Sequence, residues 1–185
     1  MSKRWEIRLT GSGGQGLILG AIILAEAAVI EEKYAVQSQS YGPEARGGSS
    51  KADIIISDDE IDFPKANKLD VLLALTQEAL NKNMGESSEK TIVIFDSSLS
   101  LPEGIVCKKA VKAPILKTAK EVVGKSIVAN IVAIAALNGI IGLVKEESLE
   151  EALMHKVPKG TEELNKRSLT EGYRLAEASQ AQENR

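Results

Sequence analysis

Short apolar runs alternate with longer helical stretches along most of the chain. The runs typical of strands fall at 5–10, 34–40, 52–57, 70–75, 91–95 and 104–109. The stretches typical of helices fall at 17–30, 77–84, 114–123, 126–144, 148–156 and 161–180. Alternating strands and helices predict a single three-layer α/β domain with a mostly parallel sheet. We expect it to cover residues 1–180, with a Rossmann-like first strand–helix unit, a helix-rich C-terminal part and a tail at 181–185.

Two of the predicted helices are unusually apolar. The stretch 17–30 has Glu26 as its single charge, so we expect it to be buried on most sides. Asn130 and Asn138 interrupt the other stretch, 127–144, and a lipid bilayer would leave their amides without partners. We therefore expect a core or subunit-contact helix there, and no membrane partner. In the isolated chain, self-association is expected to cover an apolar patch on one of these two helices.

Composition narrows the chemistry open to the chain. Its 185 residues are 43% hydrophobic and 26% charged, as in ordinary globular proteins, and the net charge of −3 gives no support to a nucleic-acid partner. One cysteine, Cys107, cannot hold an iron–sulfur cluster, which needs about four thiolates. One histidine, His155, leaves little for a zinc site, and we expect it to be at the surface or partly packed. No secretory signal is visible, so we expect a cytoplasmic location, with Cys107 reduced and buried in a strand.

A glycine-rich turn follows the first predicted strand. Gly11, Gly13 and Gly16 have the spacing of a dinucleotide-binding turn, with Gly14 and Gln15 inside it. Glycines let a ligand approach the positive end of a helix closely. The NAD-binding form also needs an acidic residue at the end of the second strand, which here reads Gln-Ser-Gln-Ser. Two interpretations stay open, a dinucleotide site and a tight helix entry that packs against another element.

The second motif is a polar loop after the second predicted strand, where open α/β sheets form ligand crevices. Its candidate site residues are Ser40, Tyr41, Gly42, Glu44, Arg46, Gly47 and Gly48. Arg46 could bind a phosphate or carboxylate with help from the neighbouring glycine amides. Alternatively, Arg46 pairs with Glu44 in a purely structural turn.

The two motifs together resemble the gamma subunit of 2-oxoacid:ferredoxin oxidoreductases. The sequence Ser-Tyr-Gly-Pro-Glu-Ala-Arg-Gly-Gly at 40–48 is similar to the 2-oxoglutarate members. The resemblance covers about residues 5–175 and includes Asn130 and the region of Gly172.

The resemblance implies a non-redox subunit that is inactive alone and has no catalytic residue of its own. Thiamine diphosphate, magnesium and [4Fe–4S] clusters are then expected on alpha, beta and possibly delta partner subunits. The complex would convert a 2-oxoacid and coenzyme A to acyl-coenzyme A and CO2, and would pass electrons to ferredoxin. Ser40, Tyr41, Arg46, Gly47 and Gly48 would face the thiamine-bearing partners and bind an anionic ligand or a partner's acid. The alternative is a stand-alone dinucleotide-binding module or small dehydrogenase.

Overall fold

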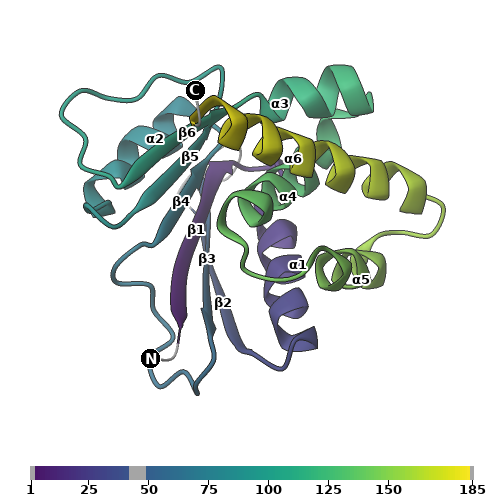
Figure 1. Cartoon of the computed structure of the whole chain (residues 1–185), viewed down its shortest axis with the longest axis horizontal. Helices are drawn as coiled ribbons and strands as arrows, with labels where there is room; N and C mark the ends of the chain where they lie inside the picture. Colours follow the sequence, from purple (N-terminus) through teal and green to yellow (C-terminus); the bar gives the residue numbers. More distant parts are fainter. Residues whose placement is uncertain (1–2, 42–48, 184–185) are drawn as a thin grey trace.

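The sheet of this computed structural model, which describes residues 3–41 and 49–183, has six strands in the order β2–β3–β1–β4–β5–β6 (Figure 1). The strands are β1 (Arg4–Ser12), β2 (Tyr34–Tyr41), β3 (Ser49–Ser57), β4 (Val71–Ala74), β5 (Ile92–Asp96) and β6 (Lys109–Ala113). Strand β3 is antiparallel to both neighbours, and the other pairings are parallel. Within the described residues, β3 alone runs against the rest, so the predicted mostly parallel sheet is confirmed.

Helices cover both faces of the sheet. They are α1 (Leu17–Ile30), α2 (Gln77–Asn83), α3 (Ile115–Lys117), α4 (Ala129–Ile141), α5 (Glu146–Lys156) and α6 (Glu162–Glu183). Two short 3-10 helices, η1 (Met84–Glu86) and η3 (Ser126–Val128), and one π-helix, η2 (Thr118–Val123), complete the set of helical segments in the described residues. Alternate residues of β4 separate the two faces. Val71 and Leu73 belong to the larger core beneath α1, α4, α5 and α6, whereas Leu72 and Ala74 pack with Leu80 of α2. The three predicted layers are therefore present.

Helix α4 is the centre of the larger core. Every residue from Ala129 to Asn138 is buried. Asn138 donates to the carbonyl oxygen of Val144 (3.0 Å) and to the hydroxyl of Tyr173 (2.9 Å), and its own oxygen accepts the amides of Leu143 and Val144. Burial raises the pKa of Tyr173 to about 12, so its hydroxyl stays protonated. The expectation of a core helix is confirmed, because its polar amide finds partners within the protein.

Small residues allow α6 to lie close to α4. A Cβ atom at Gly172 would stand 2.5 Å from Cβ of Ala135 and 2.5 Å from the carbonyl oxygen of Val132. One at Gly139 would stand 2.6 Å from Cβ of Ala176. Real Cβ atoms do not approach this closely, so any side chain at these glycines would force the two helices apart.

Several local expectations were wrong. The strand predicted at 104–109 lies at 109–113, where Val111 and Ala113 point inward and Lys112 outward, and the half-buried Cys107 lies in the preceding loop. Helix α5 begins at Glu146, two residues before the predicted start at 148, so Ser148 is buried inside it. The final helix continues to Glu183 rather than stopping at 180.

No helix in the described part of the chain is long and apolar enough to span a membrane.

Candidate functional site

The chain leaves the sheet toward opposite faces after β1 and after β4, two neighbouring parallel strands whose carboxyl ends lie side by side. After β1 the chain enters α1 on one face of the sheet, and after β4 it enters α2 on the other. The two strands are parallel neighbours, with Thr10 beside Ala74. In open α/β sheets a crevice forms at such a switch point and commonly receives the ligand. The glycine-rich turn therefore occupies the position where this fold favours binding.

The turn is closed by its own side chain. Gln15 Oε1 accepts a hydrogen bond from the main-chain N–H of Ser12 at 2.7 Å. The main-chain N–H of Gln15 in turn donates to the carbonyl oxygen of Ser12 at 3.3 Å. A Cβ at Gly11 would collide with the Gln15 side chain and with Leu17. Gln15 thus serves the turn itself, and Gly11 is small because Gln15 folds over it.

Gly16 joins the turn to the central helix. Its φ of 71° is in the left-handed region, and a Cβ there would lie 2.8 Å from Nδ2 of Asn130. Asn130 Nδ2 donates to the Gly16 carbonyl oxygen at 3.1 Å. The interpretation of the turn as a tight helix entry that packs against another element is therefore supported, and the element is the first turn of α4.

The turn still offers main-chain donors to a ligand. Gly13 and Gly14 are exposed, and the first turn of α1 has neither a side-chain cap nor an acidic residue. Uncapped N–H groups at a helix start carry partial positive charge and favour anions. What the turn can supply is amide hydrogen bonds rather than acid–base or nucleophilic side chains.

The polar loop begins at the same edge of the sheet. Ser50 of β3 pairs with Gly11 on one side and with Tyr41 on the other, so the two motifs reach the edge in register, two strands apart. Ser40 is exposed at the end of β2. The remaining loop candidates lie outside the described residues; they are Gly42, Glu44, Arg46, Gly47 and Gly48.

Strand order also bears on the dinucleotide interpretation. In dinucleotide-binding folds the second strand lies beside the first and places its acid near the ribose. Here β3 separates β2 from β1, and β2 carries no acid. Adjacent strands are about 4.8 Å apart, so the end of β2 is about 10 Å from β1. The first strand–helix unit is Rossmann-like, but the ribose-binding arrangement is not formed.

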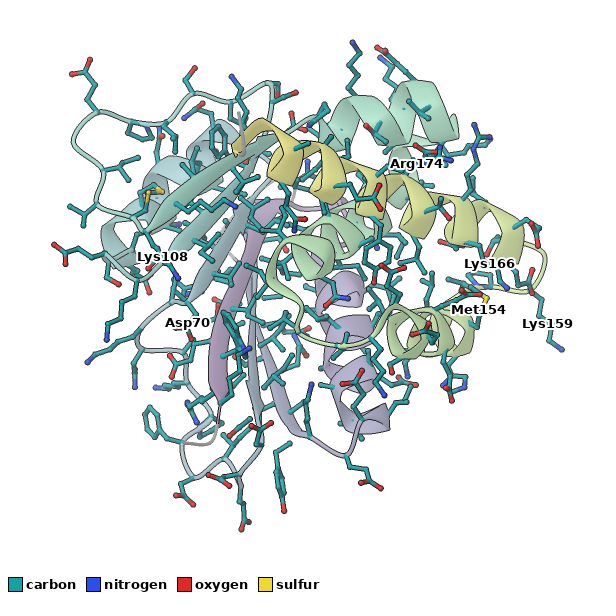
Figure 2. The ribbon with its side chains drawn as sticks, viewed as in Figure 1. Asp70, Lys108, Met154, Lys159, Lys166 and Arg174 are labelled. Atoms are coloured by element: carbon teal, nitrogen blue, oxygen red, sulfur yellow. The ribbon has the colours of Figure 1, made fainter. Side chains whose placement is uncertain are left out.

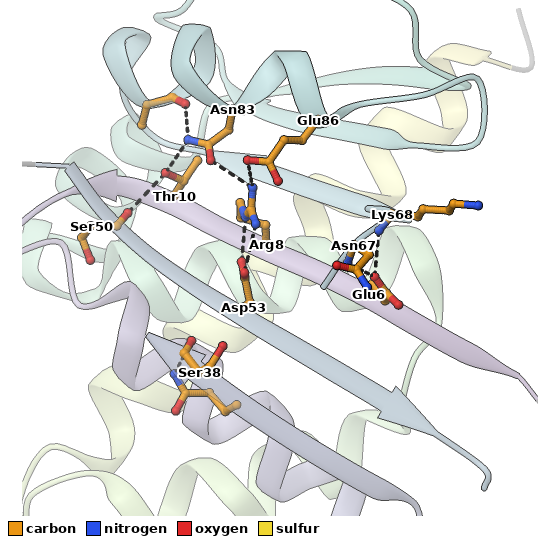
Figure 3. A network of polar contacts seen from close by, with 12 residues as sticks. Glu6, Arg8, Thr10, Ser38, Ser50, Asp53, Asn67, Lys68, Asn83 and Glu86 are labelled. Atoms are coloured by element: carbon orange, nitrogen blue, oxygen red, sulfur yellow. Dashed lines mark hydrogen bonds and ion pairs between the residues drawn. The ribbon is translucent and has the colours of Figure 1, made fainter. Parts of the chain in front are cut away.

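A buried polar network lies on the face of the sheet that α2 covers, and the sequence did not predict it (Figure 3). Arg8 is 2% exposed and donates to both carboxylate oxygens of Asp53, at 2.7 and 3.0 Å. It also pairs with Glu86 and donates to Asn83 Oδ1 at 3.3 Å, and Asn83 Nδ2 donates to Thr10 Oγ1 at 3.2 Å. The available signal was that Arg8 and Asp53 stand beside apolar residues in two strands, which the structure shows to be neighbours.

The network forms the floor of a shallow hollow of about 310 Å³. Ser38 and Ser40 of β2 line it together with Lys51 and Lys65. Among the described residues neither lysine has an ion-pair partner, whereas Arg8 is matched by two carboxylates. Ser40 therefore lies between the predicted crevice and a polar surface that the sequence did not indicate.

Three other polar side chains have structural roles. Thr76 caps α2 by accepting the amide of Ala79, and the buried Asp96 accepts the amides of Ser98 and Leu116. His155 is a surface residue as expected, and its Nδ1 lies 2.9 Å from Oε1 of Glu26. None of these three side chains faces the glycine turn as a free catalytic group.

A further hollow, of about 520 Å³, lies between α5 and α6, where Figure 2 shows Lys166 and Arg174 on α6. Lys166 pairs with Glu150, and Arg174 pairs with Glu171, each at 2.7 Å. These are exposed ion pairs that satisfy one another, so they give little reason to expect a ligand.

The donor set of the described residues does not fit a metal ion, and the sequence does not fit an iron–sulfur cluster. The described residues contain no group of three or more His, Cys, Asp and Glu side chains that could hold a metal ion. The whole sequence has one cysteine, and a [4Fe–4S] cluster needs about four thiolates. We therefore assign to this chain no step that runs through such a group.

The fold and the site define an α/β subunit that presents main-chain donors at one edge of its sheet. The model of the pyruvate ferredoxin/flavodoxin oxidoreductase family matches residues 6–175, and the chain belongs to this family.

Similar proteins give a more specific relationship. The chain is 46% identical to the 2-oxoglutarate synthase subunit KorC of Methanocaldococcus jannaschii over 94% of both chains. It is also 46% identical to the gamma subunit of a keto/oxoacid ferredoxin oxidoreductase from Geobacter sulfurreducens, with a TM-score of 0.85 over 96% of this chain and 98% of that one. A 2-oxoglutarate:ferredoxin oxidoreductase from Magnetococcus marinus, solved with 2-oxoglutarate, coenzyme A and succinyl-CoA, is 25% identical with a TM-score of 0.85; the match covers 95% of this chain and 31% of the longer one.

The contact between Gly16 and Asn130 can be tested by a double-mutant cycle. Gly16→Ala should lower the free energy of unfolding by about 2–4 kcal/mol. The new Cβ would be attached to a residue with a left-handed φ, and it would displace the Asn130 side chain from the position in which it donates to the Gly16 carbonyl oxygen. Gly14→Ala is the matched control, since Gly14 has φ 89° but open space around it, and it should cost only about 1–2 kcal/mol. In an Asn130→Ala background the extra cost of Gly16→Ala should disappear in urea titrations. An equal cost in both backgrounds would show that Asn130 does not set this approach.

The Arg8 network also makes stability depend on pH. The hydrogen bond from Arg8 lowers the pKa of Glu86 below its ordinary 4.5, although burial opposes this shift. Glu86 therefore stabilises the fold above the unfolded-state pKa, and this contribution is lost as pH falls through the lowered folded-state pKa. Glu86→Gln should be less stable than the wild type at pH 7, and the difference should shrink below about pH 4.5.

Glu89→Gln provides the control for the pH dependence. Glu89 is exposed, and the described structure gives it no ion pair, so this variant should follow the wild type at every pH. Urea midpoints measured from pH 7 to pH 3 compare the three proteins. A Glu86→Gln difference that does not change with pH would contradict the assigned pairing.

Proposed function

We propose that this chain is the gamma subunit of a 2-oxoglutarate:ferredoxin oxidoreductase. Such a complex converts 2-oxoglutarate and coenzyme A to succinyl-coenzyme A and CO2, and two electrons pass to ferredoxin. The observation that carries the proposal is the 46% identity to a 2-oxoglutarate synthase subunit across 94% of both chains. Relatives of this length and similarity from Methanothermobacter thermautotrophicus (44%) and Archaeoglobus fulgidus (42%) bear the same name.

The choice of 2-oxoglutarate as the substrate rests on sequence identity, which is higher to the 2-oxoglutarate synthase subunits than to subunits of the pyruvate and ketoisovalerate enzymes. The ketoisovalerate oxidoreductase subunit VorA of Methanothermobacter thermautotrophicus is 33% identical, and so is the common gamma subunit of the pyruvate and ketoisovalerate enzymes of Pyrococcus furiosus. Both values are below the 42–46% of the KorC relatives. The Ser-Tyr-Gly-Pro-Glu-Ala-Arg-Gly-Gly sequence of residues 40–48 supports the same choice.

The division of labour follows from what this chain can supply. Thiamine diphosphate, magnesium and [4Fe–4S] clusters would be held by alpha, beta and possibly delta subunits. A chain with one cysteine cannot supply the roughly four thiolates that each cluster needs. Coenzyme A would enter as co-substrate, and the cytoplasm remains our proposed location. The gamma chain would contribute shape, main-chain hydrogen bonds and charge at the edge where the glycine turn and the polar loop meet.

A stand-alone dinucleotide-binding role is the weaker candidate. The glycine spacing favours it, but β3 lies between β1 and β2, and Gln15 fills the turn from inside. Calorimetric titration of the chain with NADH and FAD separates the two functions. Micromolar binding of either would favour the module.

Reconstitution of the complex tests the proposed function. Complex purified with this chain should reduce a viologen dye with 2-oxoglutarate and coenzyme A, with a kcat/KM at least tenfold above that for pyruvate or 2-oxoisovalerate. The isolated chain should show no activity, and the partner subunits without it should lose most of theirs. A complex that prefers pyruvate would overturn the substrate assignment, and full activity without this chain would overturn the assignment of the subunit.

Arg46 is our proposed ligand or docking residue within that complex. Charge-assisted hydrogen bonds from a guanidinium contribute about 1.5–3 kcal/mol, and Lys keeps the charge but loses the planar fork. If Arg46 orients an anionic ligand, Arg46→Ala should raise KM for coenzyme A or 2-oxoglutarate about tenfold with assembly intact, and Arg46→Lys should restore only part of this loss. If it binds a partner's acid, assembly should weaken instead.

Arg174→Ala serves as the control for Arg46, because Arg174 is exposed on α6 and pairs only with Glu171 among the described residues. It should change neither kinetics nor assembly. If Arg46→Ala behaves like this control in both measurements, the loop is structural and the site assignment is wrong.

A further inference from the structure

The two edges of the sheet differ in how they are protected. Strand β6 carries Lys109 and Lys112, and α6 packs beside it. Strand β2, the opposite edge, is eight residues long and has no charge and no proline, and none of the described residues pairs with its outer side. Natural proteins usually block an open edge with lysine, proline, a bulge or a covering element. Within residues 3–41 and 49–183, nothing of this kind protects the edge at β2.

An apolar helix flank lies above the same edge. Helix α1 packs over β2 and β3, and Gly16 and Gly20 on one side of it meet α4, which lies toward the middle of the sheet. The opposite side of α1 therefore points past β2, and its residues follow the i, i+4, i+7, i+11 spacing of one face. They are Ile18, Ile22, Ala25 and Val29, all of them apolar. Val29 is 56% exposed, and the other three are partly exposed, with Ile18 and Ala25 also packing against the core.

We propose that this β2–α1 edge, defined as strand β2 with the flank Ile18, Ile22, Ala25 and Val29, pairs with the same edge of a second copy of the chain. The two β2 strands would run antiparallel about a twofold axis and would join the two sheets. On one face of the joined sheet, the two α1 flanks would then meet across the axis. This inference does not rest on the proposed function.

Self-pairing fits the edge for three reasons. Antiparallel pairing needs only backbone groups, which both copies present, and no charged side chain of β2 would face its like. A twofold contact closes on itself, and the lysine-bearing β6 edge would not extend it into a fibre. The apolar flank would be covered at the same time, which an isolated strand pair would not achieve.

The extent of the edge agrees with a dimer of modest stability. Eight strand residues span about 26 Å and fourteen helix residues about 21 Å. With a strand layer and a helix layer together roughly 20 Å thick, the edge covers roughly 500 Å² per chain, or roughly 1,000 Å² in total, close to the lower limit for a specific interface. The dimer should therefore dissociate on dilution in the micromolar range.

A matched pair of valine variants tests the proposal by sedimentation velocity of the full chain. Val29 is 56% exposed on the flank, and Val106 is 54% exposed in a loop far along the chain from this edge. Val29→Lys places two lysines at the joint and should weaken the dimer about tenfold or more, whereas Val106→Lys should leave it unchanged. Circular dichroism should show that both variants are folded.

Cysteine crosslinking supplies the second readout, in a Cys107→Ser background. Ser38 is exposed near the middle of β2, so in antiparallel pairing centred on this residue Ser38→Cys would lie directly opposite its counterpart on the same face, close enough for a disulfide. Oxidation should crosslink Ser38→Cys and not Lys112→Cys, an exposed position on the other edge.

Three results would overturn the proposal. One is a chain that stays monomeric at its highest soluble concentration, and another is a dimer that Val29→Lys does not weaken. The third is amide exchange that becomes slow in β2 only within the assembled complex, with no dimer of the isolated chain, because a different subunit would then occupy the edge.

Discussion

The close packing of α4 is the constraint on which the rest of this molecule depends. An apolar helix buried along its length can fit between α1 and α6 only where side chains are absent, and Gly16, Gly20, Gly139 and Gly172 stand at those places. The same contact fixes the glycine turn, because Asn130 on the first turn of α4 holds the carbonyl of Gly16. The packing of the core therefore also fixes the position of the candidate site.

The site that results is built from backbone, supported from both faces of the sheet. On one face α4 and Gln15 hold the turn; on the other, Arg8 ties β1 to β3 and to the turn after α2 through Asp53 and Glu86. A buried ion pair of this kind is costly to break, because the partner left behind stays buried and charged. Such rigidity suits a subunit that presents main-chain hydrogen bonds at one edge of its sheet.

The strand order explains why a familiar glycine spacing serves a different purpose here. Strand β3 inserts antiparallel between β1 and β2, so the polar loop after β2 reaches the same edge as the glycine turn, but two strands away. The insertion removes the ribose-binding arrangement and widens the edge into a surface. It also leaves β2 as an uncharged outer strand, so the same topological step creates both the candidate site and the unprotected edge.

Sequence alone determined the elements whose signals are local. The bounds of α1, the glycine turn, the burial of 129–138 and the absence of cluster-binding cysteines could all be predicted, because helix periodicity, glycine spacing and composition are properties of neighbouring residues. Only the tertiary structure decided the order of the strands, the partner of Gly16 and the pairing of Arg8 with Asp53. Those contacts join residues 45 to 114 positions apart, and which distant strands become neighbours depends on how all the layers pack at once.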